Sequence, residues 1–172
     1  TFGDMLAAAR ADHPGAEIII KTHPDVLAGK RRGYLQHARG GNLRMWAQPG
    51  SPIELARQVD AVYVVTSQLG FEARLAGTPV VCFGAPFYAG WGLTDDRADV
   101  PRRGVTRSLE QVFAAAYLRY PRYVDPDDGT PCELERVLDH VELQRAMFAT
   151  NTGRIFGVGF LPWKRTYVRD YL

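Results

Sequence analysis

The chain has 172 residues, of which 46% are hydrophobic and 23% charged, and its formal net charge is +2. This length is enough for one domain with a buried core, and so small a net charge offers no electrostatic reason to expect a nucleic-acid partner. No apolar run approaches the 18 residues of a membrane-spanning helix, and Cys82 and Cys132 lack the spacing of a metal site. We therefore expect reduced thiols in a cytosolic protein.

The first half of the chain alternates between helical and strand patterns. An Ala-rich start is closed by His13-Pro14-Gly15, and a later helix start combines Ser51, Pro52 and Glu54, a typical capping sequence. Helices are expected over residues 2–11, 30–38, 52–58 and 68–76, and strands over 17–21, 42–48, 61–65 and 80–83. The alternation predicts an α/β fold: a Rossmann-like parallel sheet with helices on both faces.

Beyond Gly84 the sheet pattern stops. Residues 85–105 form a long loop, and a loop of this length inside a compact domain is usually functional. Ser108 and Gln111 have the spacing of a capping box for a helix to about residue 119, and a turn at 127–129 introduces a second helix over 133–148. We expect residues 1–150 to form one domain. Residues 151–172 would be a crossing helix or the start of a further module, in a chain excised from a longer polypeptide.

A histidine follows the first expected strand directly, in the sequence His23-Pro24. Side chains at the carboxyl ends of parallel strands face the crevice where ligands bind, and a histidine there can donate a hydrogen bond to phosphate. The alternative is a histidine that caps a loop without a ligand. The other His-Pro pair, at His13, is interpreted only as a helix terminator.

The turn after the third expected strand carries the strongest local signal for an anion site. Ser67 and Gln68 open a helix whose first N–H groups lack partners, Gly70 lets a ligand approach the backbone, and Glu72 can accept hydrogen bonds from ribose hydroxyls. Each residue also has an ordinary explanation, because Ser67 can be a helix cap and Glu72 a favourable charge in the first turn.

Three groups in or near the long loop have two interpretations each. The aromatic side chains can stack on a base or sugar or can pack the loop down, and the Asp-Asp-Arg cluster can bind substrate or pair internally. The arginine pair can be solvated or can attract an anionic ligand. The three groups are Phe87, Tyr88 and Trp91; Asp95, Asp96 and Arg97; and Arg102 with Arg103. The basic run at 30–32 is interpreted as an exposed helix face.

Several catalytic motifs are absent from the sequence. There is no Walker P-loop, no dinucleotide Gly-x-Gly-x-x-Gly after a strand, no zinc pattern, no Gly-x-Ser-x-Gly elbow and no Asp-x-Asp metal-sugar motif after an expected strand. These absences argue against a kinase, a dehydrogenase, a metallohydrolase, an esterase and a metal-dependent sugar transferase, respectively.

The stretch from Ser67 to Val81 resembles the C-terminal-domain signature of glycosyltransferases with the two-domain GT-B fold. More specific are the segments KTHPD (21–25), FYAGWGLTDDR (87–97), SLEQVFAAAYLRYPRYVDP (108–126) and GTPCELERVLDHVELQR (129–145). Together they resemble the capsule polysaccharide synthesis family of bacterial retaining β-Kdo transferases. The resemblance covers residues 18–145.

This resemblance implies one half of a GT-B enzyme, the half that binds the donor nucleotide of CMP-Kdo. By the resemblance, His23 stabilises the departing CMP, and Lys21, Pro24, Ser67, Gln68, Gly70 and Glu72 contact the nucleotide, while Tyr88, Trp91 and Asp95 belong to a donor or acceptor loop. No cofactor or metal is expected, because cationic and N–H groups surround the leaving group.

The implied partners are a CMP-sugar, a lipid-linked glycan acceptor and an N-terminal catalytic domain of the same polypeptide that is missing here. The full enzyme would act in the cytoplasm at the inner-membrane face, and the chain alone would be inactive. Two alternatives stay open: a UDP-sugar transferase or epimerase domain, and a non-catalytic module that binds a glycan or a partner.

Overall fold

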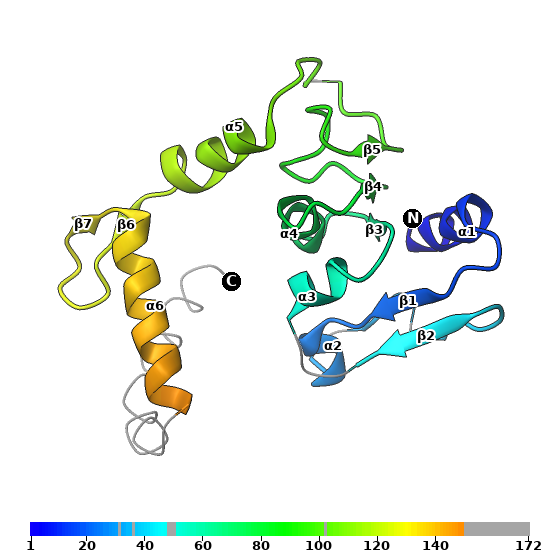
Figure 1. The fold of residues 1–172 in the computed structure, drawn as a ribbon, viewed down its shortest axis with the longest axis horizontal. Coiled ribbons are helices and arrows are strands. Elements are labelled where there is room, and N and C mark those ends of the chain that lie inside the picture. Colours follow the sequence, from blue (N-terminus) through cyan, green and yellow to red (C-terminus); the bar gives the residue numbers. More distant parts are fainter. Residues whose placement is uncertain (31, 36, 48–50, 102, 150–172) are drawn as a thin grey trace. The chain divides into compact units, whose positions relative to one another are not determined.

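The structure is a computed structural model that describes residues 1–30, 32–35, 37–47, 51–101 and 103–149 (Figure 1). These residues form two compact units, of which the first is Thr1–Val112 and the second begins at Phe113. The expected boundary near residue 150 lies at the edge of the described residues and stays a prediction. The expected helix within 151–172 lies outside them.

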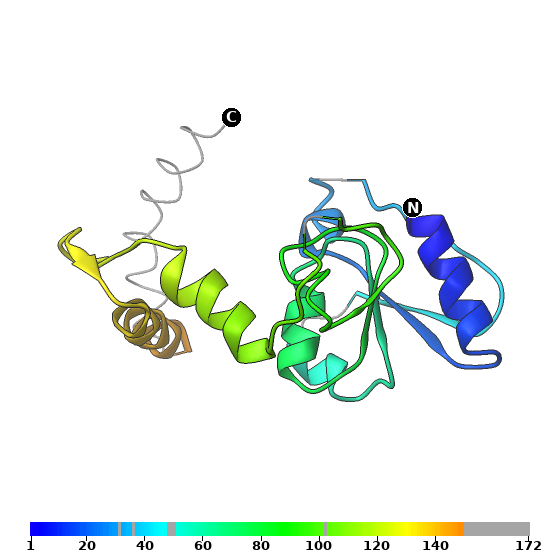
Figure 2. The same ribbon diagram turned by 90° about the horizontal axis from the view of Figure 1, so that it is seen from above.

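The first unit is an α/β fold, as predicted. Its elements in chain order are α1 (Phe2–Asp12), β1 (Ile18–Lys21), α2 (Pro24–Leu27), β2 (Leu43–Trp46), α3 (Pro52–Ala56), β3 (Val62–Val64), α4 (Leu69–Leu75), β4 (Val80–Cys82) and β5 (Asp95–Asp96). Helix α1 lies on one side of β3 to β5, whereas α3 and α4 lie on the other (Figures 1 and 2). Helices on both faces are therefore confirmed.

All strand pairs of the first unit are parallel, but they form two hydrogen-bonded sheets. Strand β1 pairs with β2, with Ile18 opposite Leu43, and β4 pairs with both β3 and β5. Strand β5 was not expected, because the sequence pattern ends at Gly84. It consists of two aspartates, and pairing with β4 makes it a strand where propensity would not.

The core of the first unit lies between α4, the sheet and the long loop. Phe71, Cys82 and Tyr88 are its largest fully buried side chains. The rings of Phe71 and Tyr88 stack, with centroids 5.8 Å apart. Gly77 ends α4 at φ +88°, and the Thr78 N–H donates to the Ala73 carbonyl at 2.9 Å.

The predicted helix over 30–38 is wrong: none of the described residues in that range is helical. A short helix, α2, lies just before this range. The following segment packs on α1, where the rings of Tyr34 and Phe2 stack at 4.3 Å and Arg10 Nη2 donates to the carbonyls of Arg39 and Gly40. These contacts with α1 take the place of the hydrogen bonds of a helix.

Helix α5 (Leu109–Phe113) ends the first unit, and its last residue begins the second, where it leads into a π-helical segment, η1 (Ala114–Arg119). An antiparallel hairpin of β6 (Tyr123–Val124) and β7 (Pro131–Cys132) follows, then α6 (Leu134–Ala149). Arg136 of α6 pairs with Asp125 and Asp127 of the hairpin. The two helices and the turn were predicted, but the hairpin, whose strand β7 contains Cys132, was not.

Candidate nucleotide-binding site

The turn between β3 and α4 carries the exposed side chains of Ser67 and Gln68. The Ser67 hydroxyl oxygen accepts from the Leu69 N–H at 3.2 Å, and the Ser67 carbonyl accepts from the Gly70 N–H at 3.1 Å. Ser67 thus makes a local hydrogen bond at the helix start, although the N-cap residue of α4 is Gln68. Glu72 lies in the first turn of α4, where its N–H donates to the Gln68 carbonyl at 3.1 Å.

Gly70 is buried against Tyr88 rather than open to a ligand. A Cβ at Gly70 would overlap the Tyr88 hydroxyl and would lie 2.8 Å from Tyr88 Cζ and 2.9 Å from Val64 Cγ2. The predicted reason for this glycine, close approach of a ligand, is thus corrected to close approach of a tyrosine ring. The Tyr88 hydroxyl donates to the Ser67 carbonyl. Tyr88 is fully buried, so of the two interpretations of the aromatic side chains, packing describes it.

The long loop is held by side chains that bind its backbone. Asp96 accepts from the Gly90 N–H at 2.8 Å and from the Thr94 hydroxyl at 2.6 Å. Arg103 donates to the carbonyls of Pro86 and Ala89, and its guanidinium lies over the Trp91 ring, 5.5 Å from the centroid.

The solvated interpretation of Arg103 is therefore wrong, because this side chain fastens the loop. Arg102 lies outside the described residues. The Trp91 indole N–H donates to the Phe87 carbonyl at 2.8 Å, and its ring is only partly buried. Phe87 is 39% exposed, so Phe87 and Trp91 are the loop aromatics that can still meet a ligand.

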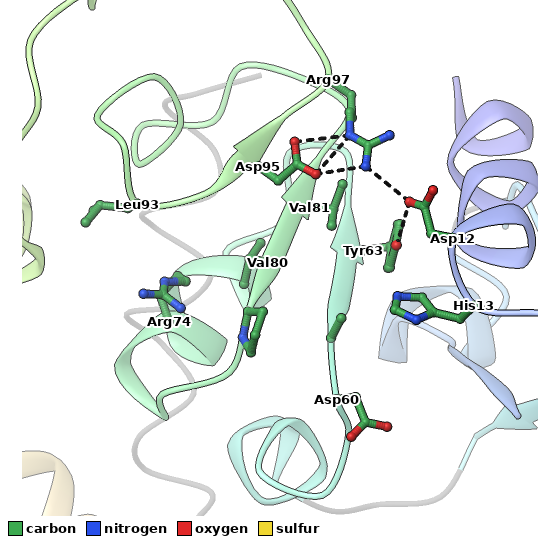
Figure 3. A pocket seen from close by; sticks show the side chains of 12 residues that line it. Asp12, His13, Asp60, Tyr63, Arg74, Val80, Val81, Leu93, Asp95 and Arg97 are labelled. Atoms are coloured by element: carbon green, nitrogen blue, oxygen red, sulfur yellow. Dashed lines mark hydrogen bonds and ion pairs between the residues drawn. The ribbon is translucent and has the colours of Figure 1, made fainter. Parts of the chain in front are cut away.

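Asp95 takes part in a polar network with Asp12 of α1 and Tyr63 of β3, on the side of the sheet that faces α1 (Figure 3). Arg97 donates to both carboxylate oxygens of Asp95 and to Asp12 Oδ2, which also accepts from the Tyr63 hydroxyl at 2.8 Å. Burial, and then the hydrogen bond to Asp12, raises the pKa of Tyr63 to about 12. The internal-pairing interpretation describes Asp95 and Arg97.

These side chains line an open groove of about 490 Å³, together with Asp60, Pro79 and other residues near the starts of β3 and β4 (Figure 3). Among the residues predicted to bind nucleotide or acceptor, only Asp95 lines this groove. The groove is therefore not the predicted crevice at the carboxyl ends of the strands.

His23 follows β1 and caps α2. Its Nδ1 accepts from the Asp25 N–H at 3.1 Å, and its carbonyl accepts from the N–H groups of Val26 and Leu27. Pro24 opens α2. In a neutral imidazole this contact puts the proton on Nε2, and because the side chain is 67% exposed, that N–H can donate to a ligand. Lys21, the last residue of β1, is half-buried.

Most of the predicted site residues fall into two groups. Ser67, Gln68, Gly70, Glu72 and Tyr88 come together around the β3–α4 turn, whereas Lys21 ends β1, which belongs to the other hydrogen-bonded sheet, and His23 and Pro24 follow it. Trp91 and Asp95 belong to neither group. Gly84 was not singled out in the sequence, although a Cβ there would lie 2.7 Å from the Val65 carbonyl oxygen. This glycine allows the backbone segments that follow β3 and β4 to lie close together.

Cys82 is buried and Cys132 is partly exposed, and neither forms a disulfide in this structure. Over the part of the chain that the structure describes, no helix has the length and apolar composition needed to cross a lipid bilayer.

The family model for capsule polysaccharide biosynthesis proteins matches residues 1–123. Among curated relatives, the capsule polysaccharide modification protein LipA of Neisseria meningitidis serogroup B is 43% identical over 178 residues, which cover 99% of this chain and 25% of LipA. The lipopolysaccharide-processing protein LpsZ of Rhizobium meliloti is 40% identical over 146 residues, 84% of this chain and 33% of LpsZ. The chain thus spans a quarter to a third of these relatives.

Two solved structures from Thermosulfurimonas dismutans are similar. One is described as KpsC, β-Kdo 2,4 transferase, with a TM-score of 0.77 and 43% identity over 81% of this chain and 44% of that one. The other is described as KpsC, β-Kdo 2,7 transferase, with a TM-score of 0.69 and 37% identity over 84% of this chain and 46% of that one.

Proposed function

Because the chain belongs to the capsule polysaccharide biosynthesis family, we propose that it is the donor-nucleotide-binding part of a retaining glycosyltransferase that transfers Kdo from CMP-Kdo. The acceptor is a lipid-linked glycan. The observation that carries the proposal is the likeness to a β-Kdo 2,4 transferase at 43% identity and a TM-score of 0.77. That likeness covers 81% of this chain.

The chain covers 44% of that transferase, and we infer that the rest of the enzyme lies elsewhere in a longer polypeptide. We place the catalytic carboxylate and the acceptor contacts mainly on an N-terminal domain, and we expect the 172-residue chain alone to bind nucleotide without catalysing transfer. The full polypeptide would work in the cytoplasm, peripherally at the inner-membrane face where its lipid-linked acceptor resides.

The chemistry assigned to this chain is stabilisation of the leaving group. When the bond between the anomeric carbon and the phosphate oxygen breaks, negative charge develops on the phosphate of CMP, and preorganised N–H and O–H donors stabilise it. The exposed Nε2–H of His23 is one such donor, because Nδ1 already accepts from the Asp25 N–H. Ser67 and Gln68 hold the phosphate, and Glu72 accepts from the ribose hydroxyls. With these donors, no divalent metal or other cofactor is required.

Calorimetric titration of the chain with CMP tests the proposal. CMP should bind equally well in EDTA and in Mg²⁺, and UMP and UDP should bind more weakly. The variant His23→Ala should bind CMP about ten- to a hundredfold more weakly, because it loses a charge-assisted contact of roughly 1.5–3 kcal/mol. His37→Ala is the matched control, since His37 is an exposed histidine with no assigned role.

The other outcomes identify the rivals. Preference for UDP or UMP would indicate a UDP-sugar transferase or epimerase domain. Absence of binding to any nucleotide would require the same titration on a full-length polypeptide. Failure there as well would contradict the proposal and favour a non-catalytic module that binds a glycan or a partner.

A further inference from the structure

We propose that Tyr88 is a positioning residue whose hydroxyl holds the turn of Ser67 and Gln68 in its nucleotide-binding shape. The inference rests on the proposed function, since it assigns a role within the same site. Tyr88 touches no substrate in this arrangement, because its side chain is fully buried.

The contact between the loop and the turn is specific. The Tyr88 hydroxyl donates to the Ser67 carbonyl, and that same carbonyl accepts from the Gly70 N–H at 3.1 Å. Both lone pairs of one carbonyl oxygen are thus engaged by donors from different segments. This fixes the orientation of the peptide that joins Ser67 to Gln68, and with it the position of both side chains.

The absence of a side chain at Gly70 is what admits Tyr88. Any Cβ at this position would overlap the hydroxyl and lie 2.8 Å from Cζ, well inside normal contact. On the other side the ring packs on Phe71, with centroids 5.8 Å apart, and on Phe87, with centroids 5.2 Å apart. Tyr88 therefore has one well-defined position, as a residue that transmits order to its neighbours must have.

The loop that presents Tyr88 is itself held in place. Asp96 binds the Gly90 N–H at 2.8 Å, and Arg103 binds the Ala89 carbonyl at 2.9 Å, so the backbone on the C-terminal side of Tyr88 is fixed twice. The position of the β3–α4 turn thus depends on a segment that lies beyond β4. A nucleotide that meets Ser67 and Gln68 meets a turn that is already ordered, so binding has less entropy to overcome.

Tyr88→Phe tests the role of the hydroxyl, because it removes one oxygen and keeps the ring. We expect CMP to bind about two- to tenfold more weakly, the loss that corresponds to one neutral hydrogen bond. In the free protein, the Gly70 amide should exchange with solvent faster than in the wild type, because its acceptor is less firmly held.

Tyr63→Phe is the matched control. It also removes a tyrosine hydroxyl hydrogen bond, here to Asp12 at 2.8 Å, but from the opposite side of the sheet. It should lower the unfolding midpoint and leave the CMP affinity and the Gly70 exchange rate unchanged. A general loss of stability would affect both variants alike, whereas positioning affects only Tyr88→Phe.

Gly70→Ala provides a second test through the same contact. It should weaken CMP binding, and the double variant Gly70→Ala/Tyr88→Phe should bind more tightly than the sum of the two single losses predicts, because both act on one contact. If Tyr88→Phe binds CMP as the wild type does and keeps its Gly70 exchange rate, the positioning role is refuted while the proposed function stands. If the wild type binds no CMP, even in a full-length polypeptide, the proposed function itself fails.

Discussion

At the scale of single residues, two predicted ligand contacts form a pair inside the protein. Gly70 was predicted to contact the nucleotide and Tyr88 to belong to the donor or acceptor loop. In the structure the two residues are in contact, because the Tyr88 ring occupies the space that a side chain at Gly70 would fill. The spacing of Ser67, Gly70 and Glu72 indicates a helix start equally well with or without a ligand. The sequence alone does not show that Tyr88 contacts Gly70, and this contact explains why the position is a glycine.

The buried ionisable groups predict how stability depends on pH. Burial raises the pKa of Cys82 to about 11 and that of Tyr63 to about 12, and it raises the pKa of Tyr88 as well. A raised pKa means that the unfolded chain loses its proton first, so the stabilisation is complete below about pH 9 and is lost as the pH rises through about 11 to 12. Urea unfolding between about pH 7 and pH 11 should show a falling midpoint.

Tyr88→Phe separates this effect from general alkaline denaturation. The phenylalanine has no proton to lose, so this variant should keep a larger share of its neutral-pH stability at about pH 11 than the wild type does. Equal fractional losses in the two proteins would contradict the assignment of the effect to buried tyrosine.

At the scale of elements, local signals identified most helices and strands of the described chain. The capping sequences are confirmed, since Ser51 Oγ accepts from the Glu54 N–H at 3.4 Å, and Ser108 and Gln111 exchange two hydrogen bonds. Strands β1, β3 and β4 could be predicted because each is a short, mainly apolar run, and β2 could be predicted although Arg44 interrupts its apolar residues. These signals act within a few residues along the chain, which is why a single sequence reveals them.

The elements that were missed depend on distant partners. Strand β5 exists because Asp95 and Asp96 pair with β4, and the Arg97 N–H donates to the Cys82 carbonyl at 2.8 Å. Residues 30–38 have a helical composition but pack on α1 through Tyr34. The η1 segment was predicted as a helix, but its π-type hydrogen bonds, such as Tyr120 N–H to the Ala115 carbonyl at 3.0 Å, leave no clear signal in the sequence.

The end of α4 supports a prediction about backbone conformation. Gly77 has φ +88°, and a Cβ added there would have no atom within 4 Å, so Gly77→Ala meets no clash and only the unfavourable left-handed conformation. We expect it to destabilise the protein by about 1–2 kcal/mol in urea unfolding.

Gly104→Ala is the control for that substitution. A Cβ at Gly104 would also have no atom within 4 Å, but the φ of this residue lies outside the left-handed region. The substitution should be neutral or slightly stabilising, by up to about 1 kcal/mol, because it restricts the unfolded chain. Equal effects at Gly77 and Gly104 would show that the conformation at Gly77 is not what the glycine supplies.

At the scale of the whole molecule, the first compact unit ends neither where the family match ends nor where the predicted domain ends. The family model ends at residue 123, the predicted domain ends at 150, and the first compact unit ends at Val112. The predicted helix over 108–119 spans that division, because a helix is recognised from its own sequence and not from the residues that it contacts. All of the residues predicted to bind nucleotide or acceptor lie before Val112.

This distribution makes the contribution of the second unit testable. A chain that ends after Tyr120 keeps α5 and η1 intact and removes the β6–β7 hairpin and α6. Since Lys21 to Asp95 hold every assigned contact, the shortened chain should fold and bind CMP within about twofold of the full chain, as measured by the same calorimetric titration. His23→Ala in the shortened chain should cause the same loss, about ten- to a hundredfold, as in the longer one.

If the shortened chain keeps its α/β circular dichroism spectrum but binds CMP much more weakly, residues after Tyr120 contribute to the site.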